Sequence, residues 1–107
     1  MDTGLKAIAD PKRREILRLV WSSEMPATDI ASHFGDVTRS AISQHLAVLR
    51  QANLIYERRD GNRRLYRANV EEMARLRTFI DQYWSGGLDR LKTAAEAAQQ
   101  KKENRHG

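Results

Sequence analysis

Arginines are concentrated in one third of this chain and carry its whole net charge. Residues 37–69 hold seven basic and two acidic side chains, while the charges of all other residues cancel. Guanidinium groups bind phosphate through paired, charge-assisted hydrogen bonds. A basic surplus confined to one part of a small domain is typical of a surface that binds nucleic acid. The basic residues are Arg39, Arg50, Arg58, Arg59, Arg63, Arg64 and Arg67.

Part of this charge lies on a predicted helix that runs from about residue 38 to residue 52. Thr38 is a good N-cap, and Ile42, Leu46 and Leu49 form a buried stripe at helical spacing. The opposite face has hydrogen-bond donors and acceptors but no acid, and consists of Arg39, Ser40, Ser43, Gln44, Ala47 and Arg50. Such a face suits the edges of bases in the DNA major groove. An inert, solvated face is the alternative.

The rest of the charge lies on a predicted hairpin over residues 54–68. Asp60-Gly61 at its tip is typical of a two-residue turn between two strands. With that turn, Glu57 would pair with Arg64 across the strands, whereas a longer loop would shift the register. The same register assigns two side chains to the core, Tyr56 and Leu65. The hairpin arginines would follow neighbouring phosphates or enter the minor groove.

Three helices are predicted before these elements. The first spans about residues 2–9, and the second begins with Asp10 as N-cap and Pro11 at the first helical position. The side chains that the second helix is expected to bury are Ile16, Leu17, Val20 and Trp21. Three basic residues in its first turn form a solvated face or phosphate contacts, namely Lys12, Arg13 and Arg14. The third helix, over residues 27–34, is expected to end at a left-handed Gly35.

A long amphipathic helix is predicted from Val70 onward, with a kink or restart at Gly86-Gly87. It has more apolar surface than a lone terminal helix would keep exposed, which favours a second copy of the chain as its partner. The residues concerned are Phe79, Tyr83, Trp84, Leu88 and Leu91. A ligand pocket lined by the two neighbouring aromatics is the alternative. The chain is polar at its end, and we expect a disordered tail over residues 99–107.

Length and composition limit the class of protein. The 107 residues fit one domain, predicted over residues 1–98, and the absence of cysteine rules out disulfides and thiolate metal sites. No apolar run has the length of a signal peptide or a membrane span, so we expect a cytoplasmic protein. No catalytic triad, glycine-rich phosphate loop or carboxylate pair emerges, so we predict neither an enzyme nor a cofactor. Asp29 and His33 lie four residues apart on one helix, and a surface pair explains them more simply than a metal site.

Three segments resemble, in order, the signature of the ArsR family of transcriptional repressors. They are ADPKRREIL over residues 9–17, SAISQHLAVLR over 40–50 followed by ANLI over 52–55, and RRDGNRRLYR over 58–67. The resemblance covers about residues 5–95. It implies a mainly α-helical winged helix-turn-helix with about five helices and a two-stranded wing. It also implies a homodimer, joined through the first and last helices, that represses transcription by binding an inverted-repeat operator in double-stranded DNA.

The resemblance implies that the helix over residues 38–52 enters the major groove and that the hairpin over residues 54–68 meets the backbone or minor groove. The candidate DNA-binding residues are Thr38, Arg39, Ser40, Ser43, Gln44, His45, Arg58, Arg59, Arg63 and Arg64. For His45, a role in helix packing is an equal alternative. The candidate dimer-interface residues are Leu5, Ile8, Phe79, Ile80, Tyr83, Trp84, Leu88 and Leu91.

The chain departs from the metal-sensing members of that family. Those members carry a cysteine pair on the third helix, where residues 27–30 of this chain read ATDI. Others use histidines and acids on the last helix, where this chain has Asp81 and Asp89 but no histidine. The resemblance therefore implies a cysteine-free subgroup, and we expect no metal and assign no inducer. A winged helix that binds a protein or RNA through its arginines is the alternative function.

Overall fold

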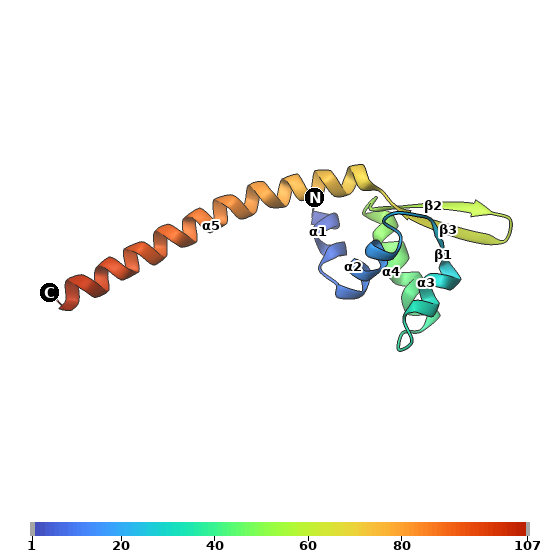
Figure 1. Cartoon of the computed structure of the whole chain (residues 1–107), viewed down its shortest axis with the longest axis horizontal. Helices are drawn as coiled ribbons and strands as arrows, with labels where there is room; N and C mark the ends of the chain where they lie inside the picture. Colours follow the sequence, from blue (N-terminus) through green and yellow to red (C-terminus); the bar gives the residue numbers. More distant parts are fainter. Residues whose placement is uncertain (1, 107) are drawn as a thin grey trace. The chain divides into compact units, whose positions relative to one another are not determined.

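The structure is a computed structural model that describes residues 2–106 of the chain (Figure 1). The side chains of residues 87–89, 91–92 and 101–106 lie outside the described set. The chain divides into two compact units, Met1–Leu76 and Arg77–Gly107. The first unit contains the predicted helix-turn-helix and hairpin, and the described residues of the second form a single helix.

Along the described residues, helices and strands follow the predicted order with one addition. The elements are α1 (Asp2–Ile8), α2 (Pro11–Leu19), β1 (Met25–Pro26), α3 (Ala27–His33), α4 (Arg39–Gln51), β2 (Ile55–Asp60), β3 (Arg63–Ala68) and α5 (Val70–His106). This order is that of a winged helix-turn-helix, which confirms the predicted fold class (Figure 1). The addition is β1, which pairs antiparallel with β3 and gives a sheet of order β1-β3-β2. A two-residue strand is too short to show the alternation by which strands are recognised.

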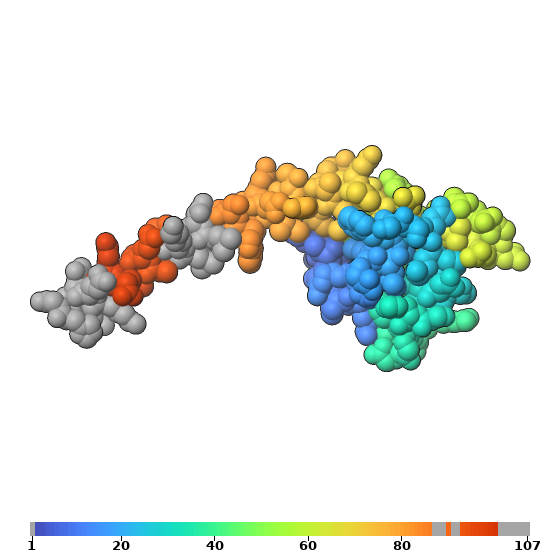
Figure 2. All heavy atoms as spheres, in the orientation of Figure 1, coloured from blue at the N-terminus to red at the C-terminus, as the bar shows by residue number. Residues whose placement is uncertain are grey.

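Helix α4 is the central element of the first unit, because it contacts α1, α2, α3 and β2. The three apolar side chains predicted for its inner face are buried. The other buried residues of this core include Ile16, Leu17, Val20, Ile30, Leu54 and Ile55. The tip of the β2–β3 hairpin, in yellow-green, projects beyond the helices of this unit (Figure 2). The other elements of this unit therefore pack against the apolar face of α4, and the end of the wing lies in solvent.

Asp10 caps α2, as the sequence predicted. One of its carboxylate oxygens accepts hydrogen bonds from the backbone N–H groups of Lys12 (2.8 Å) and Arg13 (3.3 Å). Burial alone would raise the pKa of Asp10, but these hydrogen bonds and the charge of Arg13 lower it below its ordinary value. The structure therefore stabilises the charged form of this carboxylate.

Basic residues in the first turn of α2 cap the end of α1. The Arg13 guanidinium donates to the backbone carbonyls of Ala7 (2.6 Å) and Lys6 (3.0 Å). The Arg14 guanidinium donates to the carbonyl of Ile8 (2.7 Å). The last carbonyls of a helix have no partner within it and carry its negative pole, so cations stabilise them. These two arginines therefore cap α1, a role that the sequence did not predict.

Two predicted features of the loops are wrong. Trp21 is 41% exposed and does not belong to the core, because α2 ends at Leu19 before the buried stripe reaches it. Gly35 does not adopt the left-handed conformation; α3 ends instead at Phe34 with extended backbone (φ −104°, ψ 94°). The chain leaves α3 without the tight reversal that favours glycine.

The hairpin turn is Gly61-Asn62, one residue later than predicted. Gly61 has a φ of 61°, a conformation that costs other residues steric strain, so it occupies the first position of the turn. Moving the turn by one residue places Glu57 opposite Tyr66 rather than opposite Arg64. The predicted register is therefore wrong by two positions on β3.

The two hairpin side chains assigned to the core differ in exposure. Tyr56 pairs with Arg67 and is 54% exposed, so its assignment to the core is wrong. Leu65 is buried, as predicted, and lies beside Pro26 of β1 in the sheet. A shift of two positions keeps side chains on the same face, so Tyr56 and Leu65 still share one face of the sheet, but only Leu65 is buried.

A buried asparagine joins the end of α4, the hairpin and the start of α5. Asn69 is 3% exposed, and its side-chain NH2 donates to the carbonyl of Asn53 (3.0 Å). Its Oδ1 accepts from the N–H of Glu72 (3.2 Å) and caps α5, while its backbone N–H donates to the carbonyl of Leu54 (2.8 Å). Asn53 itself is left-handed, with a φ of 62°, where the chain leaves α4. These bonds fix how the hairpin follows the helix.

Helix α5 passes through Gly86-Gly87 without a break and continues to His106. The kink or restart that we considered is therefore absent from its backbone. Residues 99–106 are also helical, where the sequence predicted a disordered tail. Glutamine, lysine, glutamate and arginine make up most of residues 99–106 and favour helix. The assignment of residues 1–98 to one functional domain stays a prediction.

Replacing Asn69 should loosen the junction of α4, hairpin and α5. We expect Asn69→Ala to lower the free energy of unfolding by about 2 kcal/mol, because it removes two part-buried hydrogen bonds, one to the carbonyl of Asn53 and one from the N–H of Glu72. Asn69→Ser keeps an acceptor for the Glu72 N–H and should lose about half as much. Urea denaturation at one protein concentration measures both. Equal losses for the two variants would contradict the role given to the Glu72 cap, and no loss for Asn69→Ser would contradict the role given to the Asn53 bond.

Alanine should destabilise the protein at Gly61 but have little effect on stability at Gly35. Gly61→Ala should lower the free energy of unfolding by about 1 kcal/mol, because alanine is strained at a φ of 61°. Gly35→Ala is the matched control, since a Cβ there meets nothing within 4 Å and its backbone is not left-handed. Thermal unfolding followed by circular dichroism compares them. If Gly35→Ala lost more stability than Gly61→Ala, Gly35 would have to be a left-handed C-cap, contrary to the structure.

Candidate nucleic-acid interface

The predicted base-reading face of α4 is open to solvent. Arg39, Ser40, Ser43 and Gln44 lie in the first turns of α4, opposite its buried stripe, and all four are exposed. No acidic side chain lies within α4. Hydroxyl, amide and guanidinium groups near the N-terminus of an exposed helix have the chemistry and position that base-edge recognition requires. Their contact with DNA stays a prediction.

Two candidate DNA-binding residues of α4 already have partners within the protein. The Thr38 hydroxyl accepts a hydrogen bond from the backbone N–H of Ala41 (3.1 Å) and caps α4, as predicted. His45 is half-buried, and its Nδ1 lies 3.4 Å from a guanidinium nitrogen of Arg13. Arg13 is also bonded to the end of α1, so His45 lies where three helices meet. Of the two roles left open for His45, this geometry favours helix packing.

Arg59 and Arg63 provide unpaired positive charge at the end of the wing. Both are exposed and flank the Gly61-Asn62 turn, one on each strand. Neither forms an ion pair with another residue in the described part of the chain, and the same holds for Arg39 on α4. A guanidinium without an internal counter-charge can bind phosphate without first losing a partner.

Three other arginines already have carboxylate partners. Arg58 donates to both carboxylate oxygens of Glu24, at 3.2 and 2.7 Å. The hydrogen bond from Arg58 holds the pKa of Glu24 below its ordinary value. Arg50 forms an ion pair with Glu57, whose other carboxylate oxygen lies 3.7 Å from Arg64. The positive charge that the wing offers to a ligand is therefore smaller than the sequence count suggests.

The sequence indicated only one of these carboxylate contacts. Glu57 was expected beside Arg64, and the contact exists, although as a diagonal rather than a directly opposite pair. Glu24 was missed, because it precedes Arg58 by 34 residues and no local pattern links them. Only the pairing of β1 with β3 brings the segment before β1 beside the wing. Long-range ion pairs of this kind have no signal in a single sequence.

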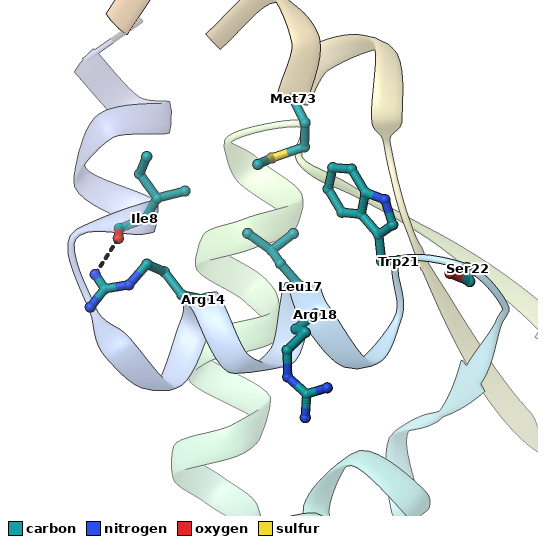
Figure 3. A pocket seen from close by; sticks show the side chains of 7 residues that line it. All are labelled: Ile8, Arg14, Leu17, Arg18, Trp21, Ser22 and Met73. Carbon is teal, nitrogen blue, oxygen red and sulfur yellow. Dashed lines mark hydrogen bonds between the residues drawn. The ribbon is translucent and has the colours of Figure 1, made fainter. Parts of the chain in front are cut away.

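An apolar pocket of about 520 Å³ lies between α1, α2 and the first turn of α5 (Figure 3). Its lining consists of Ile8, Arg14, Leu17, Arg18, Trp21, Ser22 and Met73. Leu17, Trp21 and Met73 point toward one another across it (Figure 3). Both guanidinium groups are already bonded, Arg14 to a carbonyl of α1 and Arg18 to a carboxylate of α2. The pocket offers apolar surface rather than free charge, which suits an apolar partner better than phosphate.

The second unit exposes aromatic side chains on α5. Tyr83 and Trp84 are both exposed, and the ring of Tyr83 stacks on that of Phe79 with centroids 6.5 Å apart. The remaining described candidates for a dimer interface are half-buried, namely Leu5, Ile8, Phe79 and Ile80. The side chains of Leu88 and Leu91, also assigned to that interface, lie outside the described residues. Neighbouring exposed aromatics are typical of a protein interaction surface.

The described residues contain no cluster of three or more histidine, cysteine, aspartate or glutamate side chains that could hold a metal ion. His33, which we considered together with Asp29, lies instead beside Glu15, with Nε2 and Oε1 3.1 Å apart. In the same part of the chain, no helix combines the length and the apolar character that a membrane span needs.

Comparison with known proteins agrees with this arrangement. Residues 10–57 match the family described as bacterial regulatory protein, arsR family. The HTH-type transcriptional regulator Rv2034 of Mycobacterium tuberculosis is 36% identical over 87 residues, which cover 81% of this chain and 80% of that protein. The transcriptional repressor SdpR of Bacillus subtilis is 44% identical over 70 residues, 65% of this chain and 77% of the repressor.

A solved structure extends the likeness to the fold. The crystal structure of a possible transcriptional regulator for arsenical resistance has a TM-score of 0.74 and 42% sequence identity with this chain. The match covers 85% of this chain and 93% of that one. The order of α3, α4 and the wing, the matched residues 10–57 and these relatives lead to one conclusion. The chain belongs to the ArsR family of bacterial regulatory proteins.

Proposed function

We propose that this protein is a transcriptional repressor that binds a specific sequence in double-stranded DNA. The observation that carries the proposal is the exposed, acid-free face of α4 combined with the unpaired Arg59 and Arg63 at the end of the wing. Relatives of similar sequence are named transcriptional regulator and transcriptional repressor. The role is that of a DNA-binding protein of the cytoplasm rather than an enzyme.

Recognition divides between the helix and the wing. Helix α4 enters the major groove, where Ser40, Ser43 and Gln44 meet base edges; a glutamine amide can form paired hydrogen bonds with adenine. Arg59 and Arg63 bind backbone phosphates or enter the minor groove. Phosphate contacts supply affinity and position, whereas base contacts supply the choice of sequence. Replacing the base-contacting residues should therefore lower selectivity for the operator, whereas replacing the phosphate-contacting arginines should lower the affinity for all DNA.

The repressor acts as a homodimer joined through α1 and α5. Exposed Tyr83 and Trp84 on α5 and the apolar pocket beside Ile8 support this assignment, because both offer apolar surface to a second copy. Two copies would present two α4 helices about 34 Å apart, one turn of B-DNA, so the operator is an inverted repeat. No inducer is assigned.

DNA upstream of the protein's own gene is the first operator candidate, because repressors often control their own operon. Fluorescence anisotropy with excess random duplex as competitor, at about 150 mM salt, tests it. We expect saturable binding at nanomolar protein with two protomers per site. If random duplex abolishes binding to every DNA tested, the result would contradict a sequence-specific repressor. It would favour a winged helix that binds protein or RNA.

Replacing Gln44 and replacing Arg63 should have different consequences. Gln44→Ala should weaken operator binding by about 1–3 kcal/mol and leave random-duplex binding unchanged. Arg63→Gln should weaken both equally and reduce the slope of log K against log salt by about 0.9. Gln51→Ala is the matched control, since Gln51 is exposed at the other end of α4. Anisotropy titrations at several salt concentrations measure all three. Identical behaviour of the Gln44 and Arg63 variants would exclude base reading by Gln44.

The aromatic pair on α5 should control dimerisation. We expect the double variant Tyr83→Glu, Trp84→Glu to be monomeric where the wild type is dimeric, because two charges would lie in an apolar interface. Tyr56→Glu is the control, since Tyr56 is a similarly exposed aromatic on the wing. Sedimentation equilibrium measures the mass of each. A monomeric wild type, or a double variant that still dimerises, would contradict the assignment of this interface.

A further inference from the structure

A second pocket lies between the recognition helix and the wing. It has a volume of about 420 Å³ and is lined by Ala27, Ser43, Leu46, Ala47, Arg50, Arg64 and Tyr66. Two guanidinium groups thus converge from different elements, one from the end of α4 and one from β3. Ser43, which we assign to base reading, forms part of the same wall. The pocket therefore opens on the surface that meets DNA in the proposed function.

One carboxylate serves both arginines of this pocket. Glu57 on β2 forms an ion pair with Arg50, and its other oxygen lies 3.7 Å from the Nε of Arg64. The side chain of Glu57 is 20% exposed, whereas more than half of each arginine side chain is exposed. One inward negative charge thus faces two outward positive charges. The cluster keeps a net positive charge on its open side, which attracts an anion.

Tyr66 forms the back of the pocket. It is buried and lies opposite Glu57 in the hairpin. Burial raises the pKa of the Tyr66 phenol, and the nearby charge of Glu57 adds to this effect, so the phenol stays neutral at physiological pH. Two guanidinium forks flanked by the hydroxyls of Ser43 and Tyr66 form a donor set suited to phosphate oxygens.

We propose that this pocket binds a backbone phosphate of DNA and that Glu57 is the internal counter-charge that the phosphate replaces. The proposal rests on the proposed function and adds Arg50, Tyr66 and Glu57 to it. Phosphate and carboxylate present similar paired acceptors to a guanidinium, so a phosphate can take over both arginines while α4 and β3 stay in place.

The same arrangement makes Glu57 a positioning residue. Without DNA it holds Arg50 of the recognition helix and Arg64 of the wing toward one point. With DNA, one phosphate would bridge the helix and the wing. Because its charge opposes every phosphate alike, Glu57 weakens binding to any sequence and leaves the selection of the operator to the base contacts. Its removal should therefore strengthen binding without improving specificity.

Glu57→Gln tests this directly. Removing one charge about 6 Å from a phosphate in water should tighten random-duplex binding roughly threefold for each occupied pocket, and less at high salt. Glu72→Gln is the matched control, because Glu72 is also paired with an arginine and its side chain is 24% exposed. It should bind random duplex as the wild type does. Anisotropy titrations measure affinity, and thermal melts confirm that each variant is folded.

Replacing the two pocket arginines provides an independent test. Arg50→Gln and Arg64→Gln should each weaken binding and reduce the salt slope by up to about 0.9, whereas Arg75→Gln, from the control pair, should do neither. The phosphate pocket would be wrong if Glu57→Gln bound DNA no more tightly than the wild type, or if Arg50→Gln and Arg64→Gln left the salt slope unchanged. In either case, DNA binding by the wild type would still support the proposed function. A wild type that binds no duplex would overturn both.

Inorganic phosphate distinguishes a DNA phosphate from that of a small molecule. At ionic strength matched with potassium chloride, we expect phosphate to displace DNA from the wild type no better than chloride does. Displacement at millimolar phosphate that Arg50→Gln abolishes would assign the pocket to a small phosphate-bearing molecule and overturn the DNA backbone as its ligand.

Discussion

The recognition helix and the wing can meet one duplex only if the angle between them is held, and the bonds around Asn69 hold it. This buried side chain ties the left-handed exit of α4 at Asn53 to the first turn of α5. Its backbone N–H reaches Leu54 before β2, while the neighbouring Ala68 donates to the carbonyl of Val20 after α2 (2.9 Å). The ends of two helices and both ends of the hairpin are thus joined through hydrogen bonds to backbone groups, each of which loses its partner if the junction opens.

This junction determines where the charged groups of the wing lie. Because the hairpin leaves α4 in a fixed direction, Glu57 on β2 comes within reach of Arg50 at the end of α4. The pairing of β1 with β3 does the same for Glu24 and Arg58. Internal carboxylates therefore neutralise the base of the wing and leave its tip positive. Because these carboxylates neutralise part of the wing, they lower its affinity for any DNA sequence. A lower non-specific affinity helps a regulator to leave competing DNA and find its operator.

Local sequence signals predicted the elements that carry the proposed function. Thr38 and Asp10 cap the helices assigned to them, because an N-cap depends only on the next few residues. The apolar stripe of α4 was equally readable, since its period is that of the helix. The turn was ambiguous: Asp60-Gly61 and Gly61-Asn62 both suit a two-residue turn, and a shift of one residue moved every cross-strand pair.

Features that depend on distant parts of the chain could not be predicted. The sequence alone did not show that two arginines in the first turn of α2 cap the end of α1. Strand β1 exists only because β3 lies beside it, and the contact of Glu24 with Arg58 follows from that pairing. Trp21 was expected in the core by helical spacing alone, but the helix ended first.

The central claim is that α4 and the wing, in a dimer, read one DNA sequence. Repeated selection of bound duplexes from a random pool, at about 150 mM salt, tests it without any assumption about where the operator lies. If α4 and the wing read one sequence in a dimer, we expect enrichment of an inverted repeat whose half-site centres lie about 10 base pairs apart. A selected pool that stays random in sequence, although the protein retains duplex, would contradict it.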